Sequence, residues 1–356
     1  MKITFILNGY YLKPGGGTRA VYVFANKLAA RGHEVSVIHP RYLKNSCVKE
    51  SRMISRIKFA IKKLYSPKKR AWQAIDPRVK MLHVDEPTSH NIPDADAVFA
   101  TAWETAEYVN EYPGSKGRKF YLIQHYETWS GEKELVDATW RLPLIKIVIA
   151  KWLYEKGLEL GAEKNEIVYI PYGVDHEIFR MTKEIEARPR RISMMYHTAD
   201  WKGSADGIEA IRIAKEAFPD ITAVFFSIFD KPADLPGWID FHKNPKPEDL
   251  IENIYNGSSI FISPSWTEGS PFPPREAMTC GCALVSTDCT GMDEYAIDGV
   301  NSLLSPIKDP KAMANNIIRL LRDDGLRIKL AKAGNEKMKE FKWEKAAERL
   351  EKAINE

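Results

Sequence analysis

The sequence contains no apolar run that approaches the roughly 18 residues a transmembrane helix needs. Residues 1–7 are apolar but few, and they continue into Asn8 and Gly9 without a small-residue cleavage site. We therefore expect a first β-strand there rather than a signal peptide. These absences predict a cytoplasmic protein and not one that spans the membrane.

Cysteine is also scarce. The four cysteines are Cys47, Cys280, Cys282 and Cys289, and the last three lie close together in the sequence. None of them has the C-x-x-C spacing that is typical of a zinc site. The sequence therefore predicts small buried residues in a reducing cytosol rather than a zinc site. The chain also has no G-x-G-x-x-G segment, which disfavours a dinucleotide site.

The composition fits a folded protein with two domains. The chain has 356 residues, of which 44% are hydrophobic and 28% charged. Apolar runs alternate with helical spacings in the first half, and the runs that predict strands are 3–7, 35–38, 79–84, 97–100, 120–123 and 145–149. Strand–helix alternation indicates a parallel sheet covered on both faces.

Residues 170–190 have the Pro, Gly and charge content of a linker, and the alternation restarts after them. Strands are predicted at 192–196, 221–226, 260–263 and 283–286, helices at 204–218, 247–255 and 274–280, and mostly helix from 310 onward. We predict an α/β fold of two doubly wound domains facing across a cleft. In such sheets ligands bind just after the strands end.

Two glutamates frame a proline-rich segment after the predicted strand 260–263. Glu268 and Glu276 are separated by seven residues, and a helix is expected to start near Pro274. Carboxylates at a strand-to-helix junction suit polyols, because one carboxylate can accept hydrogen bonds from two vicinal hydroxyls. The alternative is a capping loop with surface acids.

Lys202 precedes Gly203 and Ser204 where the first strand of the second domain gives way to a helix. A lysine, open N–H groups and the helix dipole together make a diphosphate site, although a lone surface lysine would look the same. A similar turn follows the very first strand, where Gly16 and Gly17 would allow a phosphate or sugar to approach the backbone, or would simply form a turn.

Several of these motifs, in the same order, resemble the family-4 retaining glycosyltransferases, which have the GT-B fold. The segment from Glu268 to Glu276 is similar to the E-x7-E signature of that family. The resemblance extends to the Gly-rich first loop, to 171–175 and to the 341–344 run. It implies an acceptor-side domain of 1–170 with helix 343–356, and a donor-binding domain of 171–342.

The resemblance also implies roles for residues. Glu276 would bind the ribose of the nucleotide, Glu268 would contact the donor sugar, and Lys202 would contact the diphosphate. In the first domain the Gly-rich loop would face the donor, and His125, at the end of strand 120–123, would contact the donor sugar. Glu127 is a possible acceptor-side base.

The sequence departs from the family pattern at two places. The usual Phe-Gly-Leu run after the first Glu-Gly is replaced by Ser270, Pro271 and Phe272, of which Ser270 and Phe272 are expected at the donor. Pro271 has no N–H, so one backbone contact to the sugar is expected to be missing. The family's arginine is replaced by His197, whose charge near a diphosphate would depend on pH.

Asp94-Ala-Asp96 has the spacing of the metal-binding motif of the other major transferase fold. It stands immediately before the strand 97–100, at the wrong edge of the sheet, so we interpret it as loop and strand entry. We therefore predict no required metal and no cofactor beyond the nucleotide-sugar substrate.

Residues 41–80 hold thirteen Lys or Arg and two acids, a local excess of +11 in a chain whose net charge is +4. Within them, 49–70 has apolar residues at helical spacing surrounded by Lys and Arg, which is typical of a helix on an anionic membrane or of one packed on its own domain. Nucleic acid is disfavoured because no aromatic platform accompanies the charge.

Together these features predict a cytoplasmic enzyme, peripheral on the inner face of the cell membrane through 49–70. It would transfer a hexosyl or deoxyhexosyl group, with retention, from a nucleotide-sugar to a glycan or lipid-linked acceptor in polysaccharide or glycolipid synthesis. The alternatives are a sugar-nucleotide epimerase of similar fold and a non-catalytic nucleotide-sugar-binding module.

Overall fold

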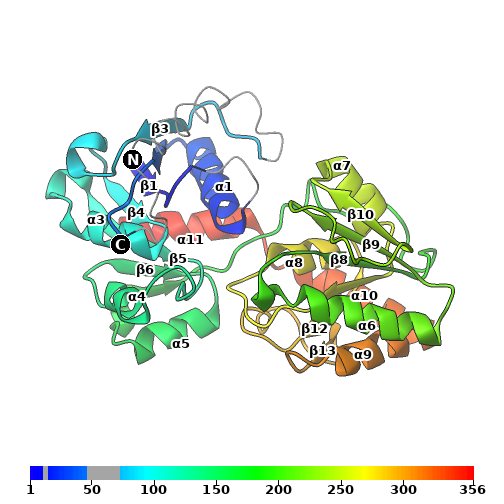
Figure 1. The fold of residues 1–356 in the computed structure, drawn as a ribbon. Coiled ribbons are helices and arrows are strands. Elements are labelled where there is room, and N and C mark those ends of the chain that lie inside the picture. The colour runs from blue at the N-terminus through cyan, green and yellow to red at the C-terminus, as the bar shows by residue number, and fades with distance from the viewer. Residues whose placement is uncertain (11–14, 46–72) are drawn as a thin grey trace. The chain divides into compact units, whose positions relative to one another are not determined.

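The computed structural model describes residues 1–10, 15–45 and 73–356. The chain divides into two compact units, Met1–Tyr172 with Trp343–Glu356, and Gly173–Lys342 (Figure 1). We call them the first and the second unit. Each is a parallel α/β sheet, so the predicted α/β class with two doubly wound domains is confirmed.

The first unit has the strand order β3-β2-β1-β4-β5-β6-β7. Its strands are β1 (Lys2–Ile6), β2 (Glu34–Pro40), β3 (Lys80–Val84), β4 (Ala97–Ala100), β5 (Arg118–Ile123), β6 (Ile145–Val148) and β7 (Ile167–Tyr169). Its helices are α1 (Gly16–Ala30), α3 (Trp103–Glu111), α4 (Lys133–Trp140), α5 (Lys151–Glu159) and α11 (Trp343–Asn355). The order reverses between β1 and β4.

The second unit has the order β10-β9-β8-β11-β12-β13. Its strands are β8 (Arg191–Met195), β9 (Thr222–Ser227), β10 (Ile239–Lys243), β11 (Ile260–Ser263), β12 (Ala283–Thr287) and β13 (Ser302–Ser305). Its helices are α6 (Ser204–Ala217), α7 (Pro247–Asp249), the π-helix η6 (Leu250–Tyr255), α8 (Phe272–Thr279), α9 (Pro310–Arg322) and α10 (Asp324–Met338). The order reverses between β8 and β11.

Apolar side chains on both faces of each sheet build the cores. In the second unit, Ile192, Ile260 and Ile262 are fully buried together with residues of α6 and α9. Continuous apolar strands are what a parallel sheet covered on both faces requires. The three described cysteines, Cys280, Cys282 and Cys289, are buried and form no disulfide, as the spacing predicts.

The C-terminal helix α11 belongs to the first unit, where it contacts α1 (Figure 1). Phe24 and Trp343 meet edge to face at 5.3 Å. Arg31 and His33, which follow the last residue of α1, both contact the Glu351 carboxylate. Apolar contact and charge pairing together dock the last helix of the chain on the first sheet.

The predicted linker, residues 170–190, contains the boundary between the two units, and its residues from Gly173 onward belong to the second unit. Ile185 is buried in the core of the second unit. Arg188 is 6% exposed and donates to the backbone carbonyls of Lys183 and Cys280. Ile185 and Arg188 therefore anchor this stretch in the second unit, because the buried guanidinium satisfies backbone carbonyls there. Most of its other charged side chains are exposed.

Candidate functional site

Two loops are packed against each other at the reversal point of the second sheet. Gly203, just before α6, has φ +60°, and a Cβ there would lie 2.0 Å from the Pro264 carbonyl oxygen. The backbone N–H of Trp266 donates to the Trp201 carbonyl at 2.7 Å. Only glycine allows this approach, so the loop after β8 has a fixed position against the loop after β11.

Lys202 and Glu268 meet across these loops. The Lys202 Nζ lies 2.7 Å and 2.8 Å from the two oxygens of the Glu268 carboxylate. Glu268 is 6% exposed, and the Ser265 hydroxyl also donates to it at 2.7 Å. The backbone of Glu268 exchanges contacts with the Thr290 hydroxyl. A buried carboxylate is costly without such partners, so the arrangement is a built charge pair rather than a surface contact.

Glu276 lies in α8, one helix turn after the proline pair. It is 3% exposed and accepts a hydrogen bond from the Tyr255 hydroxyl at 3.0 Å. The helix begins at Phe272, two residues before the predicted start, because Pro273 and Pro274 both fit its first turn. Glu276 is thus a buried acid, and the interpretation of the pair as surface acids on a capping loop is wrong for both glutamates.

Ser270 and Phe272 lie at the start of the same helix and are nearly buried. The Ser270 hydroxyl accepts a short hydrogen bond from the Arg275 guanidinium. Arg275 is fully buried, and its guanidinium lies 4.7 Å from the ring centroid of Tyr295 and 4.9 Å from that of Phe341. Arg275 therefore fixes the shape of the loop between the two glutamates.

His197 follows β8. Its Nδ1 accepts the backbone N–H of Ala199 at 2.9 Å, and its ring meets Phe229 edge to face at 4.7 Å. The pKa of His197 is lowered, mainly by burial and then by the charge of Lys202, while Glu268 opposes the shift. An Nδ1 that accepts a hydrogen bond is unprotonated, so the imidazole is neutral near pH 7.

The predicted residues of the first unit follow β1 and β5. Gly16 and Gly17 form the first residues of α1. A Cβ on Gly17 would lie 3.1 Å from the Gln124 side chain, so close packing already accounts for that glycine. His125 accepts the Tyr126 backbone N–H at 2.8 Å, and its ring meets Trp129 edge to face at 4.4 Å.

The sequence did not predict the residues that form hydrogen bonds with Glu268, Ser270 and Glu276. They are Tyr255, Ser265, Arg275 and Thr290. Arg275 left one usable signal, a charge next to Glu276 in a short helix whose remaining positions are apolar or small. Tyr255 and Thr290 left none, because each comes from a different segment and only the fold brings it to Glu276 or Glu268. Ser265, three residues before Glu268, left no signal beyond that proximity.

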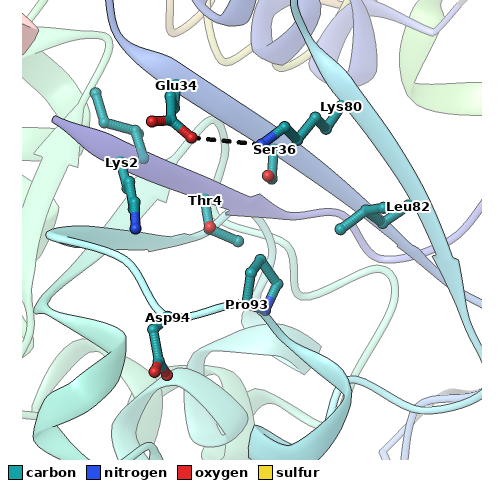
Figure 2. Close-up of a pocket in the computed structure, with 9 residues that line it drawn as sticks. Lys2, Thr4, Glu34, Ser36, Lys80, Leu82, Pro93 and Asp94 are labelled. Carbon is teal, nitrogen blue, oxygen red and sulfur yellow. Dashed lines mark hydrogen bonds and ion pairs between the residues drawn. The ribbon is translucent and has the colours of Figure 1, made fainter.

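A shallow hollow lies at the opposite, N-terminal edge of the first sheet (Figure 2). Lys80 and Glu34 form an ion pair beside it at 3.3 Å. Asp94, which Figure 2 shows below the strands, pairs with Lys116 at 2.8 Å, and Asp96 accepts the Lys2 backbone N–H. The Asp-x-Asp pattern is therefore loop and strand entry, and none of the predicted site residues lines the hollow.

The basic segment 49–70 lies outside the described residues. Among the described helices, none is both long and apolar enough to cross a bilayer. Within the same part of the chain, no group of three or more His, Cys, Asp or Glu side chains is arranged to hold a metal ion.

Comparison with known sequences finds glycosyltransferases that match part of this chain. Residues 201–323 match the profile described as Glycosyl transferases group 1. An uncharacterized glycosyltransferase of Methanocaldococcus jannaschii is 31% identical over 111 residues, which are 31% of this chain and 32% of that protein. The N,N'-diacetylbacillosaminyl-diphospho-undecaprenol α-1,3-N-acetylgalactosaminyltransferase of Campylobacter jejuni is 38% identical over 84 residues, 24% and 22% of the two chains. The match thus spans a third or less of these relatives.

Solved structures match over the whole chain. Sucrose-phosphate synthase of Thermosynechococcus elongatus superposes with a TM-score of 0.73 at 17% identity, covering 99% of this chain and 98% of that one. HepE of Anabaena, in complex with UDP and glucose, gives 0.75 at 14% identity, covering 100% and 99%. At such identities the likeness shows the fold alone. The chain therefore has the GT-B fold, and its residues 201–323 match the group 1 glycosyltransferases, as the motifs predict.

Proposed function

We propose that this protein is a retaining, metal-independent glycosyltransferase. Its donor would be a UDP-sugar, because HepE, of the same fold, is described with UDP-glucose and with UDP. Its acceptor would be a glycan or a lipid-linked sugar in polysaccharide or glycolipid synthesis. The matched relatives support this class of acceptor, since they include the lipid-diphosphate enzyme of C. jejuni and the O-antigen chain mannosyltransferase B of Escherichia coli.

The Lys202–Glu268 pair at the reversal point carries the proposal. Open α/β sheets bind ligands there, and a diphosphate brings the negative charge that a lysine beside a helix N-terminus stabilises. A bound donor would share Lys202 with Glu268 or replace that carboxylate by a phosphate. Glu268 would then accept hydrogen bonds from sugar hydroxyls, and Glu276 from the ribose.

The reaction needs no protein nucleophile. In same-face attack the bond between the sugar C1 and the diphosphate oxygen breaks as the acceptor oxygen bonds to C1. The acceptor proton passes to the departing diphosphate. Lys202 and the N-terminus of α6 would stabilise the charge that develops on that diphosphate. His125 and the Gly16–Gly17 turn remain predicted donor contacts.

Binding and turnover test this proposal together. The folded protein should be stabilised against heat by UDP and UDP-sugars more than by ADP or GDP, since a ligand that binds only the folded state raises its stability. Lys202→Met should weaken UDP binding by about tenfold or more, because a charge-assisted contact is lost. Lys329→Met, which removes an exposed lysine of the same unit, should leave it unchanged.

Product analysis separates the alternatives. The proposed enzyme should release UDP only when it transfers the sugar or hydrolyses the donor. Its product should have the donor's anomeric configuration, and it should stay active in EDTA. An epimerase converts the donor without an acceptor, and a binding module releases no UDP from any donor. Loss of activity in EDTA, or an inverted product, would refute the corresponding part of the proposal.

A further inference from the structure

A hollow of about 260 Å³ lies on one face of the first sheet, at the N-terminal ends of β1, β2 and β3 (Figure 2). Side chains two residues apart on a strand share a face, so Lys2 and Thr4 line the hollow from β1, and Glu34 and Ser36 line it from β2. The strand register places Lys2 beside Glu34 and Thr4 beside Ser36. Parallel sheets are normally apolar on both faces, so this polar corner differs from the core of the same sheet.

Thr4 and Ser36 form the floor of the hollow. Their side chains lie side by side between Lys2 and Leu82 in Figure 2, and the two residues are 2% and 8% exposed, so the paired strands hold them firmly. Among the residues that the structure describes, neither hydroxyl group forms a hydrogen bond. Each can therefore donate a hydrogen bond to a ligand in the hollow and accept one from it.

Four charged side chains stand around this floor, and their charges cancel: Lys2, Lys80, Glu34 and Asp94. Glu34 and Lys80 form an ion pair at 3.3 Å, with both side chains 62% exposed. The pKa of Asp94 is lowered, mainly by a hydrogen bond from Lys116 and to a smaller extent by the charge of Lys2, so Asp94 is ionised near pH 7. An exposed ion pair contributes little to stability, so these groups can hydrogen-bond to a ligand at small cost.

This lining suits a neutral ligand with several hydroxyl groups. Carboxylates only accept hydrogen bonds, ammonium groups only donate them, and the hydroxyl groups of a sugar do both. An anion would meet Glu34 and Asp94, and a cation would meet the two lysines, so neither class is favoured. Leu82 and Pro93 add an apolar wall for the C–H face of a ring. The volume is below the roughly 300–1,000 Å³ of pockets for drug-sized ligands, which limits the ligand to about one ring.

We propose that this hollow binds one neutral sugar residue of a glycan, held by hydrogen bonds with Thr4, Ser36 and the charged side chains around them. None of the residues predicted to contact the donor lines it. The hollow lies at the N-terminal edge of the first sheet, whereas the predicted donor contacts lie beyond the carboxyl ends of their strands. It is therefore a second carbohydrate site, and its ligand does not depend on the proposed transfer. In the proposed enzyme it holds a glycan without taking part in the reaction.

Lysine footprinting on the full chain tests the proposal, because Lys2 and Lys80 stand at the rim of the hollow. The probes are the methyl glycosides of glucose, galactose, mannose and N-acetylglucosamine, used without UDP. With at least one of them at its half-saturating concentration, acetylation of Lys2 and Lys80 should slow by about twofold, since half of the sites are then occupied. Lys164, an exposed lysine of the same unit, should react at an unchanged rate. Mass spectrometry measures each rate.

Thr4→Val and Ser36→Ala remove the floor hydroxyls with little change of shape. Each should weaken the affinity of the protecting glycoside by about threefold to tenfold, the loss expected when one or two hydrogen bonds are removed. Glu34→Gln, at an exposed position, should also weaken it, and it carries the test if a buried variant does not fold. Thr222→Val, which removes an exposed hydroxyl at the start of β9, is the matched control and should change nothing.

Three results would overturn the proposal: no neutral glycoside protects Lys2 or Lys80, the floor variants are protected as the wild type is, or inorganic phosphate or choline protects better than every neutral glycoside. UDP calorimetry on the same variants keeps the two proposals apart, since UDP binding should be unchanged in all of them. Absent UDP binding refutes the donor proposal alone, and lysines that no glycoside protects refute the sugar site alone.

Discussion

Lys202 and Glu268 form a two-point ion pair across β8 and β11, with the Lys202 Nζ 2.7 Å and 2.8 Å from the two carboxylate oxygens. The family resemblance predicts that these residues contact different parts of a donor, Lys202 the diphosphate and Glu268 the sugar. In the fold they neutralise each other. A diphosphate that reaches Lys202 therefore competes with Glu268, and this competition has measurable consequences.

Glu268→Gln should separate affinity from turnover. Without the carboxylate charge, Lys202 is available to phosphate, so UDP binding should strengthen by about threefold, the scale of a partly exposed ion pair. Turnover should fall, because the sugar contact is weakened. Calorimetry with UDP and UDP release from a UDP-sugar measure the two quantities. Glu248→Gln, at an exposed site, is the control. If Glu268→Gln binds UDP more weakly than the wild type does, Glu268 and the diphosphate do not compete for Lys202.

His197 should make donor binding depend on pH. Because burial and Lys202 lower its pKa below the ordinary 6.5, the ring is neutral at pH 7 and gains charge only in more acid solution. UDP-glucose is the suitable probe, since its diphosphate charge does not titrate in this range. Its affinity for the wild type should rise as the pH falls from 7.5 to 5.5. His197→Arg should bind more tightly and without that dependence. If the affinity for UDP-glucose depends on pH in the same way in the wild type and in His197→Arg, His197 does not contact the diphosphate.

The segment 49–70 yields a prediction from its charge alone. If it lies on an anionic membrane, the protein should float with vesicles that contain phosphatidylglycerol and not with phosphatidylcholine vesicles. Replacing Lys62, Lys63, Lys68 and Lys69 by Gln should abolish flotation. The same change of charge in the second unit is the control, made at the exposed Lys231, Lys246, Lys311 and Lys329. Equal recovery of the protein with both kinds of vesicle would exclude binding of 49–70 to an anionic membrane.

Buried strands were predictable because both of their faces must be apolar. Residues 260–263 and 97–100 read as continuous apolar runs and form β11 and β4. The strands that the pattern missed, β7, β10 and β13, all lie at sheet edges. β10 has the sequence IDFHK, and its outer positions are polar because one side of an edge strand faces water. Only alternate residues of β10 are therefore apolar, and the strand does not appear as a continuous apolar run in the sequence.

The candidate site was predictable as far as sequence spacing reaches. The two glutamates and Lys202 follow strands that the pattern finds. The pairing of Lys202 with Glu268 was not predictable, because it depends on β8 and β11 being neighbours although 64 residues separate Met195 and Ile260. The neutral state of His197 also needed the fold, since burial and a backbone donor decide it.

Tyr255 should hold Glu276 in its binding position. Tyr255→Phe removes the hydrogen bond of 3.0 Å and should lower the free energy of unfolding by about 1 kcal/mol, with weaker UDP binding. Glu276→Gln keeps an acceptor for Tyr255 but loses the carboxylate for the ribose. It should bind UDP more weakly than Tyr255→Phe does, with a smaller loss of stability. Urea denaturation and UDP calorimetry measure both. The opposite ranking for UDP would place the ribose elsewhere.

Gly203 sets the position of Lys202, so its replacement should affect both folding and binding. Gly203→Ala places a Cβ 2.0 Å from the Pro264 carbonyl oxygen at a residue with φ +60°, which should cost about 3 kcal/mol or more of unfolding free energy. Gly203→Asn separates the two causes, because asparagine tolerates positive φ but still brings the clash. Gly237→Ala is the control, since a Cβ there meets nothing within 4 Å. If Gly203→Asn is as stable as the wild type, the close approach of the two loops is not what holds Lys202 beside Glu268.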